Sequence, residues 1–282
     1  MERVAIIGVG LIGGSLALAL RKHGFKGAIA GVARRATLDK ALAAGVINEG
    51  FEEPEAAVRR ADVVYLAAPI SVILDLLPRV RDAAADHALV TDAGSTKAQI
   101  TDKASVLFFE GPVFIGGHPM AGSERRGLDH ATPDLFRGAT YVLTPTRRQD
   151  LETPAARAFL PWLERFGARV TVMDAELHDE VVAWTSHLPQ LVATGLAATV
   201  AEHVSPDNLP LAAGGLRDTT RLADSPYSIW RDICLTNSVN ILEALDAMLQ
   251  KLEYLKENLR SRALQQEFEA GQQLRERLRH SA

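Results

Sequence analysis

The chain has 282 residues, of which 47% are hydrophobic, and this length favours two domains over one. Its formal net charge of −4 gives no overall attraction to nucleic acid or to an anionic membrane, so we expect a small-molecule partner. The single cysteine, Cys234, excludes an intramolecular disulfide, and no Cys/His cluster has the spacing of a zinc site, so we expect no bound metal.

The N-terminus lacks the charged, hydrophobic and cleavage regions of a signal peptide. The longest apolar stretches, such as residues 188–201, fall short of the roughly 20 residues that span a membrane. These features predict a soluble protein of the cytoplasm, and we expect Cys234 to be a buried, inert thiol.

The first part of the chain alternates short β-branched runs with helical stretches, which predicts a doubly wound, mostly parallel sheet. The expected strands are Val4–Ile7, Ala28–Val32, Asp62–Ala67, Leu89–Thr91, Val113–Ile115, Tyr141–Leu143 and Val170–Met173. The expected helices are Leu11–His23, Thr37–Ala44, Val72–Ala85, Lys97–Leu107 and Pro154–Phe166. Glycines 24, 45 and 167 are expected C-terminal stops, and each helix should return the chain for another parallel strand.

From about Met173 onward the strand pattern is lost and the sequence reads as helix. We therefore predict an N-terminal α/β domain over residues 1–173 and an all-helical domain over residues 174–282. Five leucines repeat every three or four residues along one side of a long helix: Leu245, Leu249, Leu252, Leu255 and Leu259. That side is either internal core or the seam of a homodimer, and we expect a homodimer through this domain.

The first predicted strand runs directly into the glycine-rich segment Gly8-Val9-Gly10-Leu11-Ile12-Gly13 and then into a helix. Gly8 permits a tight turn, Gly10 lets the backbone approach a pyrophosphate, and Gly13 allows close packing of helix on strand. The start of the helix at Leu11 and Ile12 supplies amide donors and a positive dipole. The pattern predicts that residues 1–173 form a dinucleotide-binding Rossmann domain, with a merely structural glycine turn as the alternative.

The end of the second predicted strand bears on the choice of cofactor, because an NAD enzyme commonly carries an acid there for the ribose 2′-hydroxyl. This position holds Ala33, and Arg34 and Arg35 follow it. Guanidinium groups suit a 2′-phosphate, so we expect NADP. The alternative is that both arginines belong to an ordinary solvated loop and that NAD is accepted as well.

Loops that follow the strands are where open α/β sheets collect ligands. Ala68 and Pro69 follow the third predicted strand, in a loop suited to pass beneath the cofactor. Ser95 lies in the segment 92–97 after the fourth strand, where it is either a ligand contact or a helix N-cap. His118 lies in the segment Gly116–Glu124 after the fifth strand, outside any predicted element, and its near-neutral pKa suits it to accept a proton.

Two segments of the helical part predict bends around a ligand, although each is equally consistent with an ordinary helix cap. The first is Ser186–Gln190, which contains His187, and the second is the Gly-Gly segment Gly214–Ala223. In the second segment, Arg217 or Arg221 is suited to hold a substrate carboxylate.

The ordered set of these segments resembles the prephenate and arogenate dehydrogenases of tyrosine biosynthesis, and the resemblance covers nearly the whole chain. It implies oxidative decarboxylation of a cyclohexadienol, in which hydride passes to the nicotinamide and His118 accepts the hydroxyl proton. It further implies that Ser95 bonds near the ring hydroxyl, that His187 helps to hold the substrate, and that Arg221, or less directly Arg217, pairs with a carboxylate. Residues 174–282 then form a domain for substrate binding and dimerisation.

Two other functions compete with this one. A β-hydroxyacid dehydrogenase resembles a different pattern, with a lysine followed four residues later by asparagine, and no lysine here has that partner. A nonenzymatic NADP-binding sensor retains the fold without activity. The sequence does not distinguish prephenate from L-arogenate, which differ in a keto or an amino group.

Overall fold

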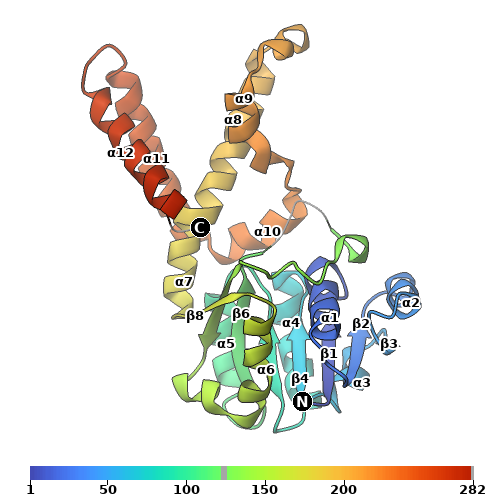
Figure 1. The fold of residues 1–282 in the computed structure, drawn as a ribbon. Coiled ribbons are helices and arrows are strands. Elements are labelled where there is room, and N and C mark those ends of the chain that lie inside the picture. The colour runs from blue at the N-terminus through green and yellow to red at the C-terminus, as the bar shows by residue number, and fades with distance from the viewer. Residues whose placement is uncertain (122–125, 281–282) are drawn as a thin grey trace. The chain divides into compact units, whose positions relative to one another are not determined.

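The computed structural model describes residues 1–121 and 126–280, and by its contacts the chain forms two compact units, Met1–Ser238 and Val239–Ala282. Within the described residues, one eight-stranded sheet runs in the order β3-β2-β1-β4-β5-β6-β7-β8 (Figure 1). The strands are β1 (Arg3–Ile7), β2 (Ala28–Val32), β3 (Glu49–Phe51), β4 (Val63–Leu66), β5 (Leu89–Asp92), β6 (Val113–Pro119), β7 (Thr140–Pro145) and β8 (Arg169–Val172). The order reverses between β1 and β4, which is the switch point where open α/β sheets bind ligands.

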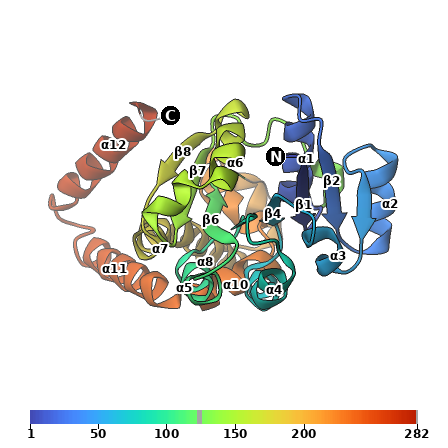
Figure 2. The same cartoon turned by 90° about the horizontal axis from the view of Figure 1, so that it is seen from below.

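Helices cover both faces of the sheet (Figure 2), as expected of a doubly wound fold. They are α1 (Leu11–Lys22), α2 (Arg35–Ala43), α3 (Pro54–Val58), α4 (Ile70–Ala83), α5 (Ala98–Leu107) and α6 (Pro154–Arg165). Strands β4 and β5 are buried along their whole length, in the core between the two helical layers. The predicted helix stops are confirmed, because Gly24, Gly45 and Gly167 have φ of 92°, 66° and 81°, a backbone region that favours glycine.

The predicted fold class is confirmed. The sheet is mostly parallel, as predicted, and its exception is β7, which pairs antiparallel with β6. Between them the described chain forms only the short 3-10 helix Leu128–His130, and not the long crossover helix that a parallel neighbour needs. Strand β3 was missed because it is a three-residue edge strand without an apolar run.

The position of His118 differs from the prediction, because it lies within β6 and not outside a regular element. The pairing of β6 with β5 ends at Ile115, but its pairing with β7 continues to Pro119 and sets His118 opposite Val142. The antiparallel neighbour therefore extends β6 beyond the apolar run by which the sequence marked it.

After β8 the described chain is helical, as predicted. The first unit contains α7 (Ala175–Val182), the π-helical segment Ala183–His187, α8 (Leu188–His203), α9 (Gly214–Thr220) and α10 (Tyr227–Thr236). Gly214 and Gly215 begin α9 and do not form the predicted loop. Cys234 on α10 is partly exposed, whereas we expected a buried thiol, since only part of this helix packs inward.

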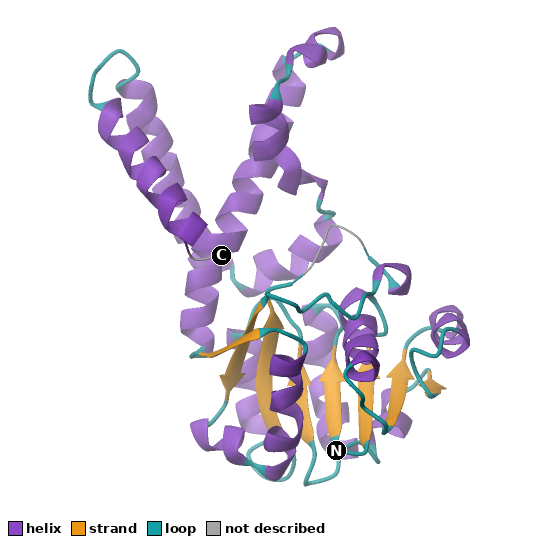
Figure 3. Ribbon diagram, viewed as in Figure 1, coloured by secondary structure: helices purple, strands orange, loops and turns teal. Residues whose placement is uncertain are grey.

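The second unit is a pair of helices, α11 (Ser238–Glu257) and α12 (Leu264–His280), joined by a short turn (Figure 3). Leu259 falls in that turn, beyond the end of α11, so it does not extend the predicted leucine row. Leu249 and Leu252 are exposed, which makes the internal-core interpretation wrong for them. Among the described residues, no helix combines the length and the apolar character needed to cross a bilayer.

Candidate active site

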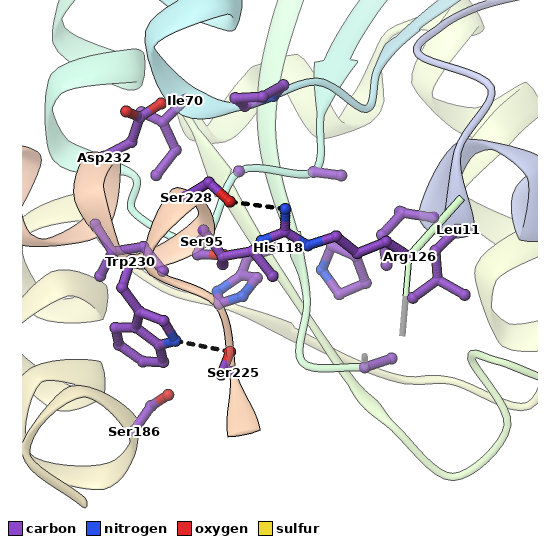
Figure 4. Close-up of a pocket in the computed structure, with 18 of the residues that line it drawn as sticks. Leu11, Ile70, Ser95, His118, Arg126, Ser186, Ser225, Ser228, Trp230 and Asp232 are labelled. Atoms are coloured by element: carbon purple, nitrogen blue, oxygen red, sulfur yellow. Dashed lines mark hydrogen bonds between the residues drawn. The ribbon is translucent and has the colours of Figure 1, made fainter. Parts of the chain in front are cut away.

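A cavity of about 720 Å³ lies in the first unit, at the carboxyl ends of β1, β4, β5 and β6. Residues from the ends of these strands line it together with residues of the helical segments 186–190 and 221–233. Figure 4 shows Ser95 and His118 on the sheet side, and Ser186, Ser225 and Trp230 from the helical segments. The cavity therefore joins the predicted cofactor end of the sheet to the predicted substrate segments.

The glycine loop fits a dinucleotide. Gly8 has φ of 98°, and a Cβ on it would lie 2.2 Å from the carbonyl oxygen of Ala67. A Cβ on Gly13 would lie 2.1 Å from the oxygen of Gly8, so helix and strand pack here as closely as predicted. At Gly10 nothing lies within 4 Å of such a Cβ, and no side chain caps the helix that begins at Leu11. Open space before uncapped amides suits a pyrophosphate.

The other predicted cofactor contacts divide into two groups. Leu11, Ile12, Ala68 and Pro69 line the cavity, whereas Gly8, Gly10 and Gly13 are not among the residues that line it. Arg34 and Arg35 lie outside the cavity, after the end of β2, and both are exposed.

Arg35 also forms an ion pair with Asp39 on the same helix, with the two atoms 3.0 Å apart. No acid stands at the end of β2, since Ala33 directly follows Val32. The placement of both guanidinium groups is thus compatible with a 2′-phosphate and equally with a solvated helix start.

His118 and Ser95 both line the cavity, as their predicted roles require. His118 Nδ1 lies 2.8 Å from Nε2 of His178. Burial lowers the pKa of His118 well below its usual value, and His178, Lys97 and His187 add to this effect. The ring is therefore neutral at pH 7, as a proton acceptor must be, and its pKa lies well below the near-neutral value expected from the sequence.

Ser95 and its neighbour Thr96 are not helix caps, which removes the alternative interpretation of Ser95. Helix α5 begins at Ala98, and its first amides are capped from α7 instead: the Asp179 carboxylate accepts hydrogen bonds from Lys97 N at 2.7 Å and from Ala98 N at 3.0 Å. Thr96 Oγ1 bonds Thr236 Oγ1 at 2.7 Å. Ser95 is therefore held on the cavity wall by its neighbours.

A buried ion pair ties the Ser95 loop to the His118 strand. Lys97 Nζ donates to Asp92 and, at 2.8 Å, to the carbonyl oxygen of Gly117. The Asp92 carboxylate also accepts from Gly94 N at 2.7 Å and from Gly117 N at 3.0 Å. Burial lowers the pKa of Lys97, and Asp92 acts in the opposite direction. The two backbone segments bonded here directly precede Ser95 and His118.

His187, in the predicted segment Ser186–Gln190, lines the cavity at the end of the π-helical segment Ala183–His187. π-Helical turns are rare and are often found at functional sites. Asn237 Nδ2 lies 3.2 Å from His187 Nδ1, and the indole of Trp230 meets the ring edge-on at 5.7 Å. Burial lowers the pKa of His187 to about 4, with Asp179 opposing the shift. His187 is thus neutral at pH 7.

Only one of the two arginines predicted to hold a substrate carboxylate lines the cavity. Arg221 lines it, but Arg217 on α9 does not and is exposed. The sequence analysis did not single out Arg126, which lines the cavity and whose Nη1 donates to Ser228 Oγ at 2.8 Å (Figure 4). Residues Gly122, Ser123 and Glu124 of the predicted segment lie outside the described residues. Among the described residues, no cluster of His, Cys, Asp or Glu is arranged to hold a metal.

Two family models match this chain. Residues 16–172 match the nucleotide-binding domain of prephenate dehydrogenase, and residues 174–279 match its dimerization domain. The chain belongs to the prephenate dehydrogenase family. The family predicted from the sequence motifs is thereby confirmed.

Individual relatives agree with the family models. Prephenate dehydrogenase of Lactococcus lactis is 36% identical over 98% of this chain and 77% of its own length. A crystal structure of prephenate dehydrogenase from A. aeolicus, in complex with hydroxyphenyl propionate and NAD+, has 33% identity and a TM-score of 0.83 over 100% of this chain and 96% of that one. Synechocystis arogenate dehydrogenase has 32% identity and a TM-score of 0.77 over 97% of this chain and 96% of that one. The predicted function, a prephenate or arogenate dehydrogenase of tyrosine biosynthesis, is confirmed at this level.

Proposed function

We propose that this chain oxidises and decarboxylates prephenate or L-arogenate with NADP, and that His118 is the base. The observation that carries the proposal is the position of His118 and Ser95 together on the cavity wall, beside Leu11 and Ile12 of the dinucleotide loop. A ring bound in this cavity has its reacting carbon between a proton acceptor and the cofactor end of the sheet.

The chemistry needs one proton acceptor and an oriented ring. The nicotinamide, when bound, accepts the hydride from the ring carbon that carries the hydroxyl. His118 accepts the hydroxyl proton as the hydride leaves, and its lowered pKa keeps the ring neutral and able to do so. Ser95 hydrogen-bonds near the same hydroxyl, and the Asp92–Lys97 pair holds both residues in place. Loss of carbon dioxide then makes the ring aromatic.

The two carboxylates of the substrate need cations in the cavity, because an unpaired buried charge is costly. We assign this task to Arg221 and Arg126, and we set Arg217 aside because it lies outside the cavity. His187, held by Asn237 and Trp230, contacts the substrate as a neutral donor or acceptor. The Arg126–Ser228 bond gives way to the substrate carboxylate, since a charged acceptor is the stronger partner of a guanidinium.

The preference for NADP rests on Arg34 and Arg35 and on the missing acid at Ala33. Both guanidinium groups are exposed after the end of β2, next to the glycine loop, since Gly8 N bonds Val32 O at 2.9 Å. NAD remains the competing cofactor.

We also propose that the chain works as a homodimer, with the boundary between its Rossmann and helical domains near residues 173 and 174. The match of residues 174–279 to a dimerization domain supports both parts of this proposal. The exposed leucines Leu249 and Leu252 on α11 supply apolar surface for such an interface. The cytoplasmic location stays a prediction of the sequence.

The test is to follow nicotinamide reduction by purified protein with prephenate or L-arogenate, each with NADP or NAD. We expect turnover of at least one acid, faster with NADP. If NADP binds but no pair of substrate and cofactor reacts, the proposal is wrong and the sensor interpretation takes its place. Faster turnover with NAD contradicts only the cofactor assignment.

A further inference from the structure

Two residues that the sequence did not single out, His178 and Asp179, stand directly behind His118. His118 Nδ1 lies 2.8 Å from His178 Nε2, and the two rings meet near the perpendicular with centroids 5.0 Å apart. His178 Nδ1 in turn lies 2.7 Å from Asp179 Oδ1. His178 and Asp179 are each 1% exposed, so this row of contacts runs from the cavity into the protein interior.

The direction of these hydrogen bonds is fixed at the Asp179 end. One carboxylate oxygen accepts from Lys97 N and the other from Ala98 N. Both amides belong to the start of α5, where the helix dipole favours a negative charge. Asp179 is therefore an ionised acceptor with no proton to give. His178 Nδ1, its neighbour, must be the donor.

We take His178 as a neutral imidazole, which has one N–H donor and one acceptor nitrogen, and the remaining positions follow from this assignment. Since His178 donates from Nδ1, its Nε2 accepts. His118 must then donate to it from Nδ1, and Nε2 of His118 is left with a free lone pair. Because Nδ1 is turned toward buried His178, Nε2 is the nitrogen available to a ligand in the cavity.

We infer that Asp179 and His178 are positioning residues that hold the proton on Nδ1 of His118 and keep Nε2 as the acceptor for the substrate hydroxyl. The inference rests on the proposed role of His118 as base. In the opposite arrangement His118 Nε2 carries a hydrogen and cannot accept the substrate proton. Asp179 also caps the helix that follows Ser95, so one carboxylate orients both residues of the reacting end.

The first test is spectroscopic and does not need activity. Nitrogen-15 NMR of histidine-labelled wild-type protein at pH 7 distinguishes the two neutral forms of a ring, and a His118→Phe variant identifies the His118 signals among the eight histidines. We expect the form with hydrogen on Nδ1. Hydrogen on Nε2 overturns the inference, whether or not the protein turns over either acid.

The second test compares three variants by kcat, with NADP affinity and melting temperature as measures of the fold. His178→Leu removes the acceptor, and we expect kcat to fall about 100-fold or more, within the range of general-base contributions. His178→Gln restores it, because an amide oxygen accepts from His118 while the amide nitrogen donates to Asp179, and kcat should return to within about tenfold of wild type. His87→Gln, at an exposed histidine, is the control and should leave kcat unchanged.

The Asp179→Asn variant tests whether the Asp179 carboxylate sets the direction of the hydrogen bonds between Asp179, His178 and His118. An amide places N–H hydrogens where the carboxylate now accepts, so it favours the reversed arrangement, and we expect the NMR signals of His118 to shift toward hydrogen on Nε2. A comparable exchange in a Ser-His-Asp triad costs about 10⁴-fold in kcat. Wild-type kcat in His178→Leu, or equal losses in His178→Leu and His178→Gln, contradicts the inference. If wild type turns over neither acid but shows hydrogen on Nδ1, the proposed function fails while the proton assignment stands.

Discussion

Replacement of Lys97 by Met tests whether the buried Asp92–Lys97 pair builds the site. Both side chains are completely buried. The Lys97 ammonium donates to Asp92 and to the carbonyl oxygen of Gly117, while Asp92 also accepts from the amides of Gly94 and Gly117. The Met variant keeps the length of the side chain and removes only the charge and its hydrogen bonds. Asp92 is then a buried carboxylate with two backbone donors and no cation.

The expected magnitude follows from that uncompensated charge. Breaking a buried ion pair from one side costs about 3–5 kcal/mol of unfolding free energy. The double variant Asp92→Asn/Lys97→Met carries no buried charge, and replacement of a whole pair by neutral groups is often near neutral. In the double variant, the side-chain amide nitrogen at position 92 faces the backbone amide of Gly94 or Gly117. This unfavourable contact costs about 1–3 kcal/mol of unfolding free energy. The double variant should therefore be more stable than Lys97→Met alone.

The assay is urea unfolding followed by circular dichroism, with free energies from linear extrapolation. Lys26→Met, at an exposed lysine, is the matched control and should change stability by no more than about 0.5 kcal/mol. The reasoning is refuted if the unfolding free energy of Lys97→Met lies within about 1 kcal/mol of wild type, or if the double variant is no more stable than Lys97→Met. The folded Lys97→Met protein should also have a lower kcat, since the bonded glycines precede Ser95 and His118.

Four further predictions concern the site. His118→Ala should lower kcat by about 10²–10⁴-fold and leave the Kd of NADP unchanged; equal loss of both would indicate a structural role. Joint replacement of Arg34 and Arg35 by Ala should reduce kcat/KM at least about tenfold with NADP and little with NAD, which steady-state kinetics with the two cofactors will measure. Arg126→Gln should raise the KM of the acid about tenfold with little change in kcat, and an unchanged KM would remove Arg126 from the clamp. The pKa of His187 is lowered to about 4 in the folded protein, so protonation of this ring at low pH favours the unfolded state. The contribution of neutral His187 to the free energy of unfolding should be complete above pH 6.5 and should fall by up to about 3 kcal/mol as the pH falls toward 4. Urea midpoints of His187→Gln should therefore vary less with pH over that range than those of wild type.

Most of the fold could be predicted because its signals are local. A run such as Val63–Leu66 is buried on both faces, so it reads as continuous apolar sequence, and Gly24 or Gly167 marks a helix end by a backbone conformation that other residues avoid. Strand β3 carries neither signal. Its three residues lie at the edge of the sheet and are defined only by their pairing with β2.

The residues of the candidate site also differ in whether the local sequence marks them. Gly8, Ser95, His118 and His187 were found because the sequence pattern placed each in a segment after a strand or at a break in a helix, although His118 lies within β6. His178 was missed, since it lies inside the regular helix α7 and its role comes from a contact with His118 sixty residues away in sequence.

By itself, the sequence determined most of the elements, the glycine loop, the family and the histidine that we propose as the base, because hydrophobic periodicity and turn chemistry act between neighbours along the chain. Only the tertiary structure decided that β7 runs antiparallel, that Asp179 and not Ser95 caps α5, and that Arg126 rather than Arg217 reaches the cavity. These features depend on which polar atoms meet once distant segments have packed. A hydrogen-bond donor is equally visible in the sequence whichever partner it finds, so its partner is known only from the fold.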